Sequence, residues 1–184
     1  YSEKEMHGLQ IWIALPKELE QMEPEFFHLD SSQIPSWEDA YTQFKLIAGE
    51  AFGRKSPVPV YSKLYMLEIK SKIRQHIKIG HELYGESGLY ILEGSIESEG
   101  NTYLPKQILI AKDSSLCEFV MEANTSIYIF GGELFPEERF IDWNFVGSSK
   151  EIISDAREKW IKQGFPKIKG DENEFVPYPS SLRK

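Results

Sequence analysis

Three positions between Gly80 and Gly94 have a spacing that could place their side chains around one metal ion. His81 and Leu83 lie two residues apart, so both would face one side of a strand, and Ser87 follows four residues later. Gly94 would close the hairpin seven residues further on. A divalent ion needs about three or four N or O ligands at roughly 2.0–2.2 Å. Leu83 offers no ligand atom and the neutral Ser87 hydroxyl is a poor substitute for a carboxylate, so this stretch predicts no catalytic metal.

The spacing resembles the metal motif of the cupins, in which histidines stand at the first two of these positions and a glutamate at the third. Cupins take a fourth ligand from a later strand of pattern G-x5-P-x-G-x2-H, and the nearest match here is GNTYLPKQILI, residues 100–110. Gln107 stands where that pattern has its second glycine, and Ile110 where it has its histidine. His81 is then a vestigial position, which we expect to be an ordinary strand histidine bonded to a neighbour or to water. Restoring the missing histidine and glutamate would supply three converging ligands.

The composition limits the classes of partner. The chain has 184 residues with a formal net charge of -8, and hydrophobic residues make up 41% of it. It is therefore long enough to bury a core and too apolar to be disordered. The acidic balance disfavours direct nucleic-acid binding, because phosphate contacts need clustered lysine and arginine.

The single cysteine, Cys117, indicates a reducing compartment, because it cannot form an internal disulfide. We interpret it as a small hydrophobic residue in a strand, since no base or oxyanion site is suggested nearby. The chain shows no charged-then-apolar leader, and no apolar run approaches the roughly 18 residues of a membrane span. These features predict a cytoplasmic protein that does not contact a membrane.

Strand signals dominate the chain. Apolar residues recur in short runs bounded by Gly, Pro, Asn or Asp, and in the second half these turns are separated by about ten residues. That cadence is typical of a sandwich or barrel. We therefore predict an all-β double-stranded β-helix, a cupin or jelly-roll barrel, as a single domain over residues 1–184. The expected strands are residues 9–15, 44–50, 61–69, 88–93, 95–99, 107–111, 116–122 and 126–130.

One α-helix is expected within residues 148–163. Ser148 and Glu151 form a capping box at its start. Apolar residues recur every four positions from Ile152, so one face can pack on the barrel. Residues 165–184 should then form a tail that docks along the body. The docking residues we expect are Phe175, Val176 and Tyr178.

The alternation of the strand after His81 predicts which side chains line the barrel interior. The expected wall consists of His81, Leu83, Ser87, Leu89, Ile91 and Glu93. Such a mostly apolar wall belongs either to a pocket for a small molecule or to a filled core, and we favour the filled core.

Several strings together resemble the pirin family of two-domain cupin proteins. HGLQIWIALP (residues 7–16) is similar to the segment that opens the second pirin domain, and IAGEAFGRKSPVPVYS (47–62) to that domain's next signature. YILEG (90–94) resembles its hairpin. FGGELFPEERFIDWNFVGSSKEIISDAREKW (130–160) resembles the family's WNFVSSS string with its following helix, and GDENEFVPYP (170–179) resembles the C-terminus of bacterial members. The resemblance covers nearly the whole chain.

This resemblance implies that the chain corresponds to the C-terminal cupin domain. Pirins bind iron or another divalent metal in their N-terminal domain through three histidines and a glutamate, so no cofactor is expected here. Residues 1–7 would be a remnant of the inter-domain junction. Tyr1-Ser2-Glu3 resembles the last H-x-E string of that metal site with tyrosine in place of histidine, and Glu3 alone would not hold a metal.

Three functions stay open. The leading hypothesis is a non-catalytic module that acts as a structural half or in protein interaction, because pirins are partners of transcription regulators and metabolic enzymes. The first alternative is a part of a metal-dependent quercetin 2,3-dioxygenase-like enzyme whose metal domain is absent from this chain, because that chemistry needs a redox ion with open positions. The second is a small-molecule-binding barrel.

The expected partner is another protein or a second cupin domain. The strand expected at residues 9–15 could also pair with its equivalent in another copy, which would give a homo-oligomer. Aromatic side chains are the candidates for contact residues. They are Trp37, Tyr41, Trp143 and Tyr178.

Overall fold

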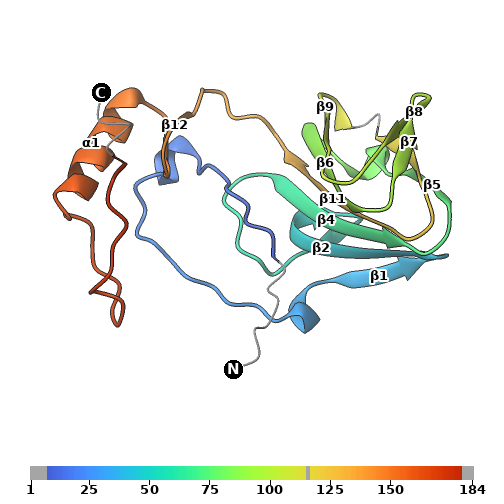
Figure 1. Ribbon diagram of the computed structural model, residues 1–184, viewed down its shortest axis with the longest axis horizontal. Helices are drawn as coiled ribbons and strands as arrows, with labels where there is room; N and C mark the ends of the chain where they lie inside the picture. Colours follow the sequence, from blue (N-terminus) through green and yellow to red (C-terminus); the bar gives the residue numbers. More distant parts are fainter. Residues whose placement is uncertain (1–7, 115–116, 180–184) are drawn as a thin grey trace. The chain divides into compact units, whose positions relative to one another are not determined.

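The computed structural model describes residues 8–114 and 117–179 (Figure 1). The chain forms two compact units, where the sequence predicts one domain. The larger unit is Glu23–Leu134, and the smaller one combines Tyr1–Met22 with Phe135–Lys184. The predicted junction at residues 1–7 and the end of the predicted tail lie outside the described residues.

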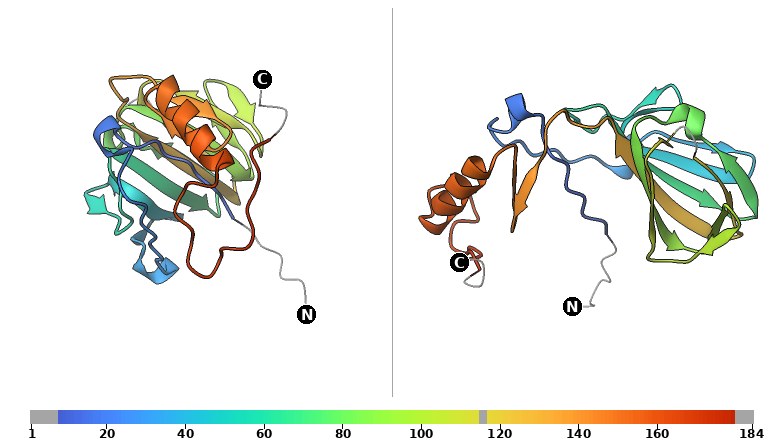
Figure 2. Two further views of the ribbon diagram at one scale, coloured as in Figure 1. Left: turned by 90° about the vertical axis from the view of Figure 1, so that its left-hand side faces the viewer. Right: turned by 90° about the horizontal axis from the view of Figure 1, so that it is seen from above.

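The larger unit is built almost entirely of antiparallel strands, which confirms the all-β cupin barrel. One sheet has seven strands in the order β1-β2-β4-β11-β6-β9, with β3 paired to β2, and a second sheet has four in the order β5-β10-β7-β8 (Figure 2). The strands are β1 (Ser36–Asp39), β2 (Thr42–Ala51), β3 (Arg54–Lys55), β4 (Leu64–Ser71), β5 (Gln75–Lys78), β6 (Glu86–Glu93), β7 (Ile96–Ser98), β8 (Asn101–Tyr103), β9 (Ile108–Ala111), β10 (Glu118–Met121) and β11 (Thr125–Gly132). A 3-10 turn, η2 (Ser31–Gln33), precedes β1, and a second one, η3 (Gly80–Glu82), lies between β5 and β6.

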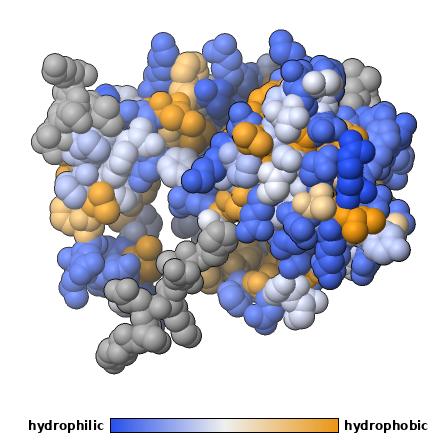
Figure 3. All heavy atoms as spheres, turned by 45° about the vertical axis from the view of Figure 1, so that its right-hand side comes forward, coloured by the Kyte–Doolittle hydropathy of each residue, from blue (hydrophilic) through white to orange (hydrophobic). Residues whose placement is uncertain are grey.

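The core lies between these two sheets, because side chains alternate across each strand. Leu46, Leu67, Ile129 and Leu89 stand in register on β2, β4, β11 and β6 and form one buried row. The smaller sheet contributes its own buried residues to the same cluster. They are Ile77, Ile96, Phe119 and Met121. The face shown in Figure 3 is mainly hydrophilic, with hydrophobic residues in separate groups.

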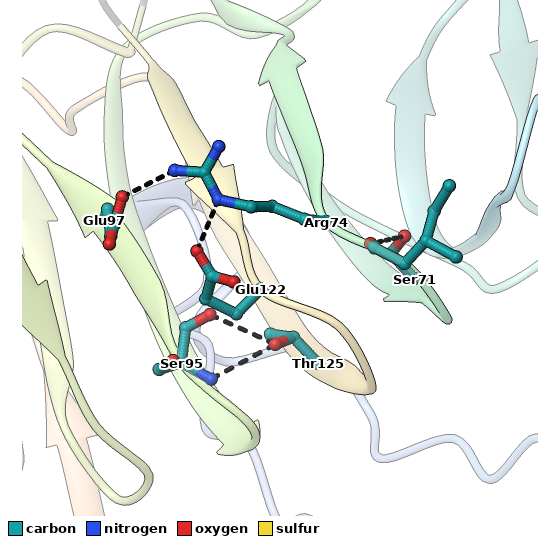
Figure 4. Close-up of polar contacts among 7 residues, drawn as sticks. Ser71, Arg74, Ser95, Glu97, Glu122 and Thr125 are labelled. Carbon is teal, nitrogen blue, oxygen red and sulfur yellow. Dashed lines mark hydrogen bonds and ion pairs between the residues drawn. The ribbon is translucent and has the colours of Figure 1, made fainter.

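Polar contacts fasten the turns at one end of the barrel (Figure 4). Arg74, between β4 and β5, donates from Nε to Glu122 (2.7 Å) and from Nη2 to Glu97 (2.8 Å). The Thr125 hydroxyl accepts from the amide of Ser95 and donates to its carbonyl, both at 3.1 Å. The exposed ion pairs add little stability by themselves. Together, however, these contacts tie the turn after β4 to β7 and to the turn after β10, and the start of β11 to the turn before β7.

The smaller unit holds its own small set of elements. They are η1 (Lys17–Leu19), β12 (Phe140–Asp142), β13 (Phe145–Gly147) and the helix α1 (Lys150–Ile161). Its core is aromatic. The rings of Trp143, Phe145, Trp160, Phe165 and Tyr178 contact one another at centroid distances of 5.2–6.3 Å. No helix of residues 8–114 and 117–179 has the length and apolar character needed to cross a bilayer.

The predicted helix is present, but its cap is not Ser148. The N-cap is Ser149, whose hydroxyl accepts from the amide of Ile152 at 3.3 Å. Ser148 is already engaged by the Glu20 carboxylate, which accepts from its amide at 2.9 Å and from its hydroxyl at 2.7 Å. A long-range contact therefore moved the cap by one residue.

The predicted strand at residues 9–15 is wrong. Residues 8–16 form no strand or helix. A strand needs a neighbour for its amides and carbonyls. The Leu15 carbonyl instead accepts from a side chain, the Arg139 guanidinium, at 3.0 Å. Leu9, Ile11 and Trp12 are exposed.

The tail after α1 docks through only one of its three expected residues. Tyr178 is buried and its hydroxyl donates to Asp142 Oδ2 at 2.8 Å. Phe175 and Val176 are exposed, although the Val176 carbonyl accepts from the Trp160 indole at 2.8 Å. Backbone and hydroxyl contacts, which hydropathy does not indicate, thus hold this part of the tail.

Candidate functional site

The four predicted metal-ligand positions do not converge. His81 has a side chain that is 73% exposed, with Nε2 3.5 Å from Glu82 Oε1. Leu83 and Ser87 are buried in the barrel, whereas Ile110 on β9 is 66% exposed. Restoring a histidine and a glutamate at positions 83 and 87 would therefore not create the three-ligand site that the sequence suggests.

His81 departs from the prediction because it is not on a strand. Gly80–Glu82 is a 3-10 turn, closed by the Glu82 amide bonding the Ile79 carbonyl at 2.9 Å. Residues two apart in such a turn do not share a face as they would on a strand. The imidazole consequently points to solvent.

Four of the six positions of the predicted interior wall are buried. Leu83, Ser87, Leu89 and Ile91 are buried, and the three apolar ones belong to the core cluster. His81 and Glu93 are exposed, and a local feature of the backbone explains the exposure of each. Packed side chains therefore occupy the barrel interior at these positions.

A β-bulge accounts for Glu93. Ile127 pairs with Ile91 but the preceding residue, Ser126, pairs with Glu93, so Leu92 is an extra residue on β6. An extra residue reverses the inward and outward alternation beyond it. Glu93 thus lies on the outer face of the sheet, beside Ser126.

The barrel interior holds a small polar group that the sequence patterns above do not indicate. The hydroxyls of Tyr65 and Ser87 share a buried hydrogen bond of 2.6 Å. Ser114 is fully buried nearby, and Tyr84 sets its ring edge-on to Tyr65 at 5.0 Å. The alternation Tyr65, Leu67, Ile69 on β4 could have revealed the inward Tyr65, because these residues share one face.

The ionisation of this group is unfavourable. Burial raises the pKa of Tyr65, and hydrogen bonds with Ser87 and Ser114 offset part of that rise. Burial raises the pKa of Tyr84 to about 12, aided by repulsion from Tyr65 and nearby carboxylates. Burial raises the pKa of Cys117 to about 11. These groups stay protonated at neutral pH, so they can exchange hydrogen bonds but supply neither a base nor a thiolate.

The side chains present do not fit a cupin metal ion. Within the two described stretches, no group of three or more His, Cys, Asp or Glu side chains lies close enough together to hold one. A leucine and a serine at the ligand positions supply at most one weak neutral donor. The position of the cupin glutamate is occupied instead by the Ser87 hydroxyl bonded to Tyr65.

The four aromatic contact candidates have different surroundings. Trp37 stacks on Phe44 at 5.3 Å and carries the Arg54 guanidinium over its ring. Trp143 and Tyr178 belong to the aromatic core of the smaller unit. Tyr41, in the turn between β1 and β2, is 61% exposed. Of the four, Tyr41 is thus the one whose ring is mainly open to solvent.

Comparison with known proteins gives a consistent result. A family model described as the pirin C-terminal cupin domain matches residues 66–166. A pirin-like protein of Caulobacter vibrioides is 36% identical over 176 residues, which is 95% of this chain and 60% of that protein. A Pseudomonas aeruginosa protein provisionally named quercetin 2,3-dioxygenase is 30% identical over 159 residues, 86% of this chain and 50% of that protein.

Solved structures agree with the sequence relatives. A crystal structure of quercetin 2,3-dioxygenase from Acinetobacter baumannii superposes with a TM-score of 0.76 and 26% identity, over 91% of this chain and 56% of that one. The chain thus spans about 50% to 60% of the length of the proteins that it matches.

Proposed function

Because this chain belongs to the pirin family, through that family's C-terminal cupin domain, we propose that it is a non-catalytic cytoplasmic module that docks on a second cupin domain. The observation that carries this proposal is the apolar segment at residues 9–13. The interior of the barrel supports the non-catalytic part, since its ligand positions are filled by Leu83 and by the Tyr65–Ser87 pair.

The segment at residues 9–13 is strongly apolar and open to solvent. Leu9, Ile11, Trp12 and Ile13 are each between 40% and 54% exposed. The segment is not part of any strand, and its amides and carbonyls make no backbone hydrogen bond to another described residue, so they can pair with the edge of another sheet. Exposed large side chains next to unpaired backbone favour docking on a partner. Just after the segment, the Arg139 guanidinium donates to the Leu15 carbonyl and so holds the backbone there.

The occupant that we propose is a second cupin domain. The matched proteins are longer than this chain, which spans 60% and 50% of the first two relatives. Their remaining length is enough for another domain of this size class. In a sample that holds only this chain, a second copy supplies the equivalent cupin domain, so self-association reports on the same surface.

Replacing Ile11 and Trp12 by glutamate should abolish self-association, because two charges would be buried in the interface. We expect the unaltered chain to form dimers at about 10–100 μM in sedimentation analysis, as a modest interface would allow. The double variant should sediment as a monomer. Ile168→Glu, at another exposed isoleucine, is the control and should leave the dimer intact. A monomeric unaltered chain at about 1 mM would contradict the proposal.

A second candidate function is a catalytic share in quercetin oxidation, which the names of the Pseudomonas and Acinetobacter proteins favour. If the non-catalytic proposal is right, the full chain supplied with Fe(II) and quercetin shows the same oxygen uptake as buffer with Fe(II) and quercetin. The reason is that no open-coordination redox site is formed. Uptake that rises with the concentration of the chain would overturn the non-catalytic proposal and support the second candidate.

A further inference from the structure

We propose that the outer face of the seven-stranded sheet carries a binding site for a small, uncharged, polyhydroxylated ligand of the sugar type. The site is a hollow of about 350 Å³ where β4, β6 and β11 meet the turn between β1 and β2. We refer to it as the Ser126 hollow. Its lining includes Glu38, Tyr41, Lys70, Lys72, Glu93 and Ser126.

The Ser126 hydroxyl is the first observation that points to a ligand. Ser126 is 5% exposed, and its Oγ makes no hydrogen bond with the rest of the described chain. Two neighbouring hydroxyls of the same wall are satisfied by the protein (Figure 4). Ser71 donates to the Ile73 carbonyl at 2.8 Å, and Thr125 bonds the backbone of Ser95. A buried hydroxyl without a partner is destabilising, and a ligand that hydrogen-bonds to it would remove that cost.

The β-bulge at Leu92 is the second observation. It brings Glu93 to the outer face opposite Ser126, while Lys70 pairs with Ser126 from β4 on the other side. Ser126 consequently stands between Glu93 and Lys70 in the strand register. The Lys70 ammonium pairs with Glu68 at 2.8 Å and would exchange that contact for one to a ligand. Bulges often stand beside binding sites, where they redirect a side chain.

The charges around the hollow select the class of ligand. Glu38 and Glu93 balance Lys70 and Lys72, so an ionic ligand would be attracted by one pair and repelled by the other. An uncharged ligand with several hydroxyls can donate to the carboxylates and accept from the ammonium groups at once. Tyr41, with its exposed ring at the rim, offers an apolar surface for the C–H face of a sugar. Together these features favour a sugar-type ligand.

The test is a titration of the full isotope-labelled chain with D-glucose, D-mannose and maltose, followed by amide chemical shifts. We expect saturable shifts at Tyr41, Lys70 and Ser126 with at least one sugar, at a dissociation constant on the order of 1–10 mM. Sodium acetate and ethylamine, as charged probes, should not saturate the hollow. Ser126→Ala and Tyr41→Ala should each weaken sugar binding by about fivefold or more, and Thr102→Ala, on β8, should not.

Thermal unfolding separates a binding role from a structural one. Ser126→Ala should unfold at the same or a higher temperature than the unaltered chain, because it removes an unpartnered buried hydroxyl. Three results would each overturn the inference. They are shifts that do not saturate by about 100 mM sugar, saturation by acetate or ethylamine alone, and undiminished sugar binding by Ser126→Ala.

Discussion

Gly131→Ala is expected to destabilise the protein by about 3 kcal/mol or more, the range for overpacking that cannot relax. Gly131 lies in β11 between Tyr65 on β4 and Ser87 on β6. A methyl group there would overlap the Glu86 carbonyl oxygen and come within 2.5 Å of the Tyr65 hydroxyl. Neither can yield easily, since one is backbone and the other is held by the buried bond to Ser87.

Chemical denaturation with a constant m-value measures this loss. Gly8→Ala is the matched control, because a methyl group there meets no atom of residues 8–114 or 117–179 within 4 Å. We expect it to change the free energy of unfolding by less than about 0.5 kcal/mol. A loss below about 1 kcal/mol for Gly131→Ala would show that the barrel interior is loosely packed around Tyr65 rather than filled.

The double change Leu83→His with Ser87→Glu should destabilise the chain by several kcal/mol, because it buries two polar groups in a filled core. It should also leave metal content near zero after purification. The third ligand that the cupin spacing suggests, His81, is exposed on a turn and does not point to these positions. Metal analysis of the unaltered chain should likewise give a value near zero. Stoichiometric iron, nickel or copper in either protein would contradict the structural account of this site.

The pH dependence of the single variant Ser87→Glu gives a second readout, since Leu83→His would add a buried imidazole whose lowered pKa acts in the opposite direction. Burial would raise the folded-state pKa of the introduced carboxyl above the unfolded value of about 4.3. The neutral form is then favoured in the folded state, so the variant loses stability as the pH rises from about 4 through the raised pKa. Thr102→Glu, the same kind of change on exposed β8, should show little of this dependence.

Local patterns were sufficient for the main strands, the helix and the family. Alternation in residues 44–50 and 126–130 predicted β2 and β11. One face of each strand packs on the core, so buried apolar residues recur at every second position. The helix appeared within its predicted range because its apolar spacing is also local. The absence of ligand atoms at Leu83 and Ile110 needed no coordinates, since residue type alone decides it.

Tertiary structure decided the features that depend on distant partners. Ser149 rather than Ser148 caps α1, because Glu20, far away in the chain, engages Ser148. The bulge at Leu92 turned Glu93 outward because strand pairing sets the register, and a single extra residue reverses the faces. The segment at residues 9–15 has the alternation of a strand but no neighbouring strand, and a strand exists only when its backbone hydrogen bonds are made. The Tyr65–Ser87 pair formed because β4 and β6 flank β11, an adjacency that no local pattern contains.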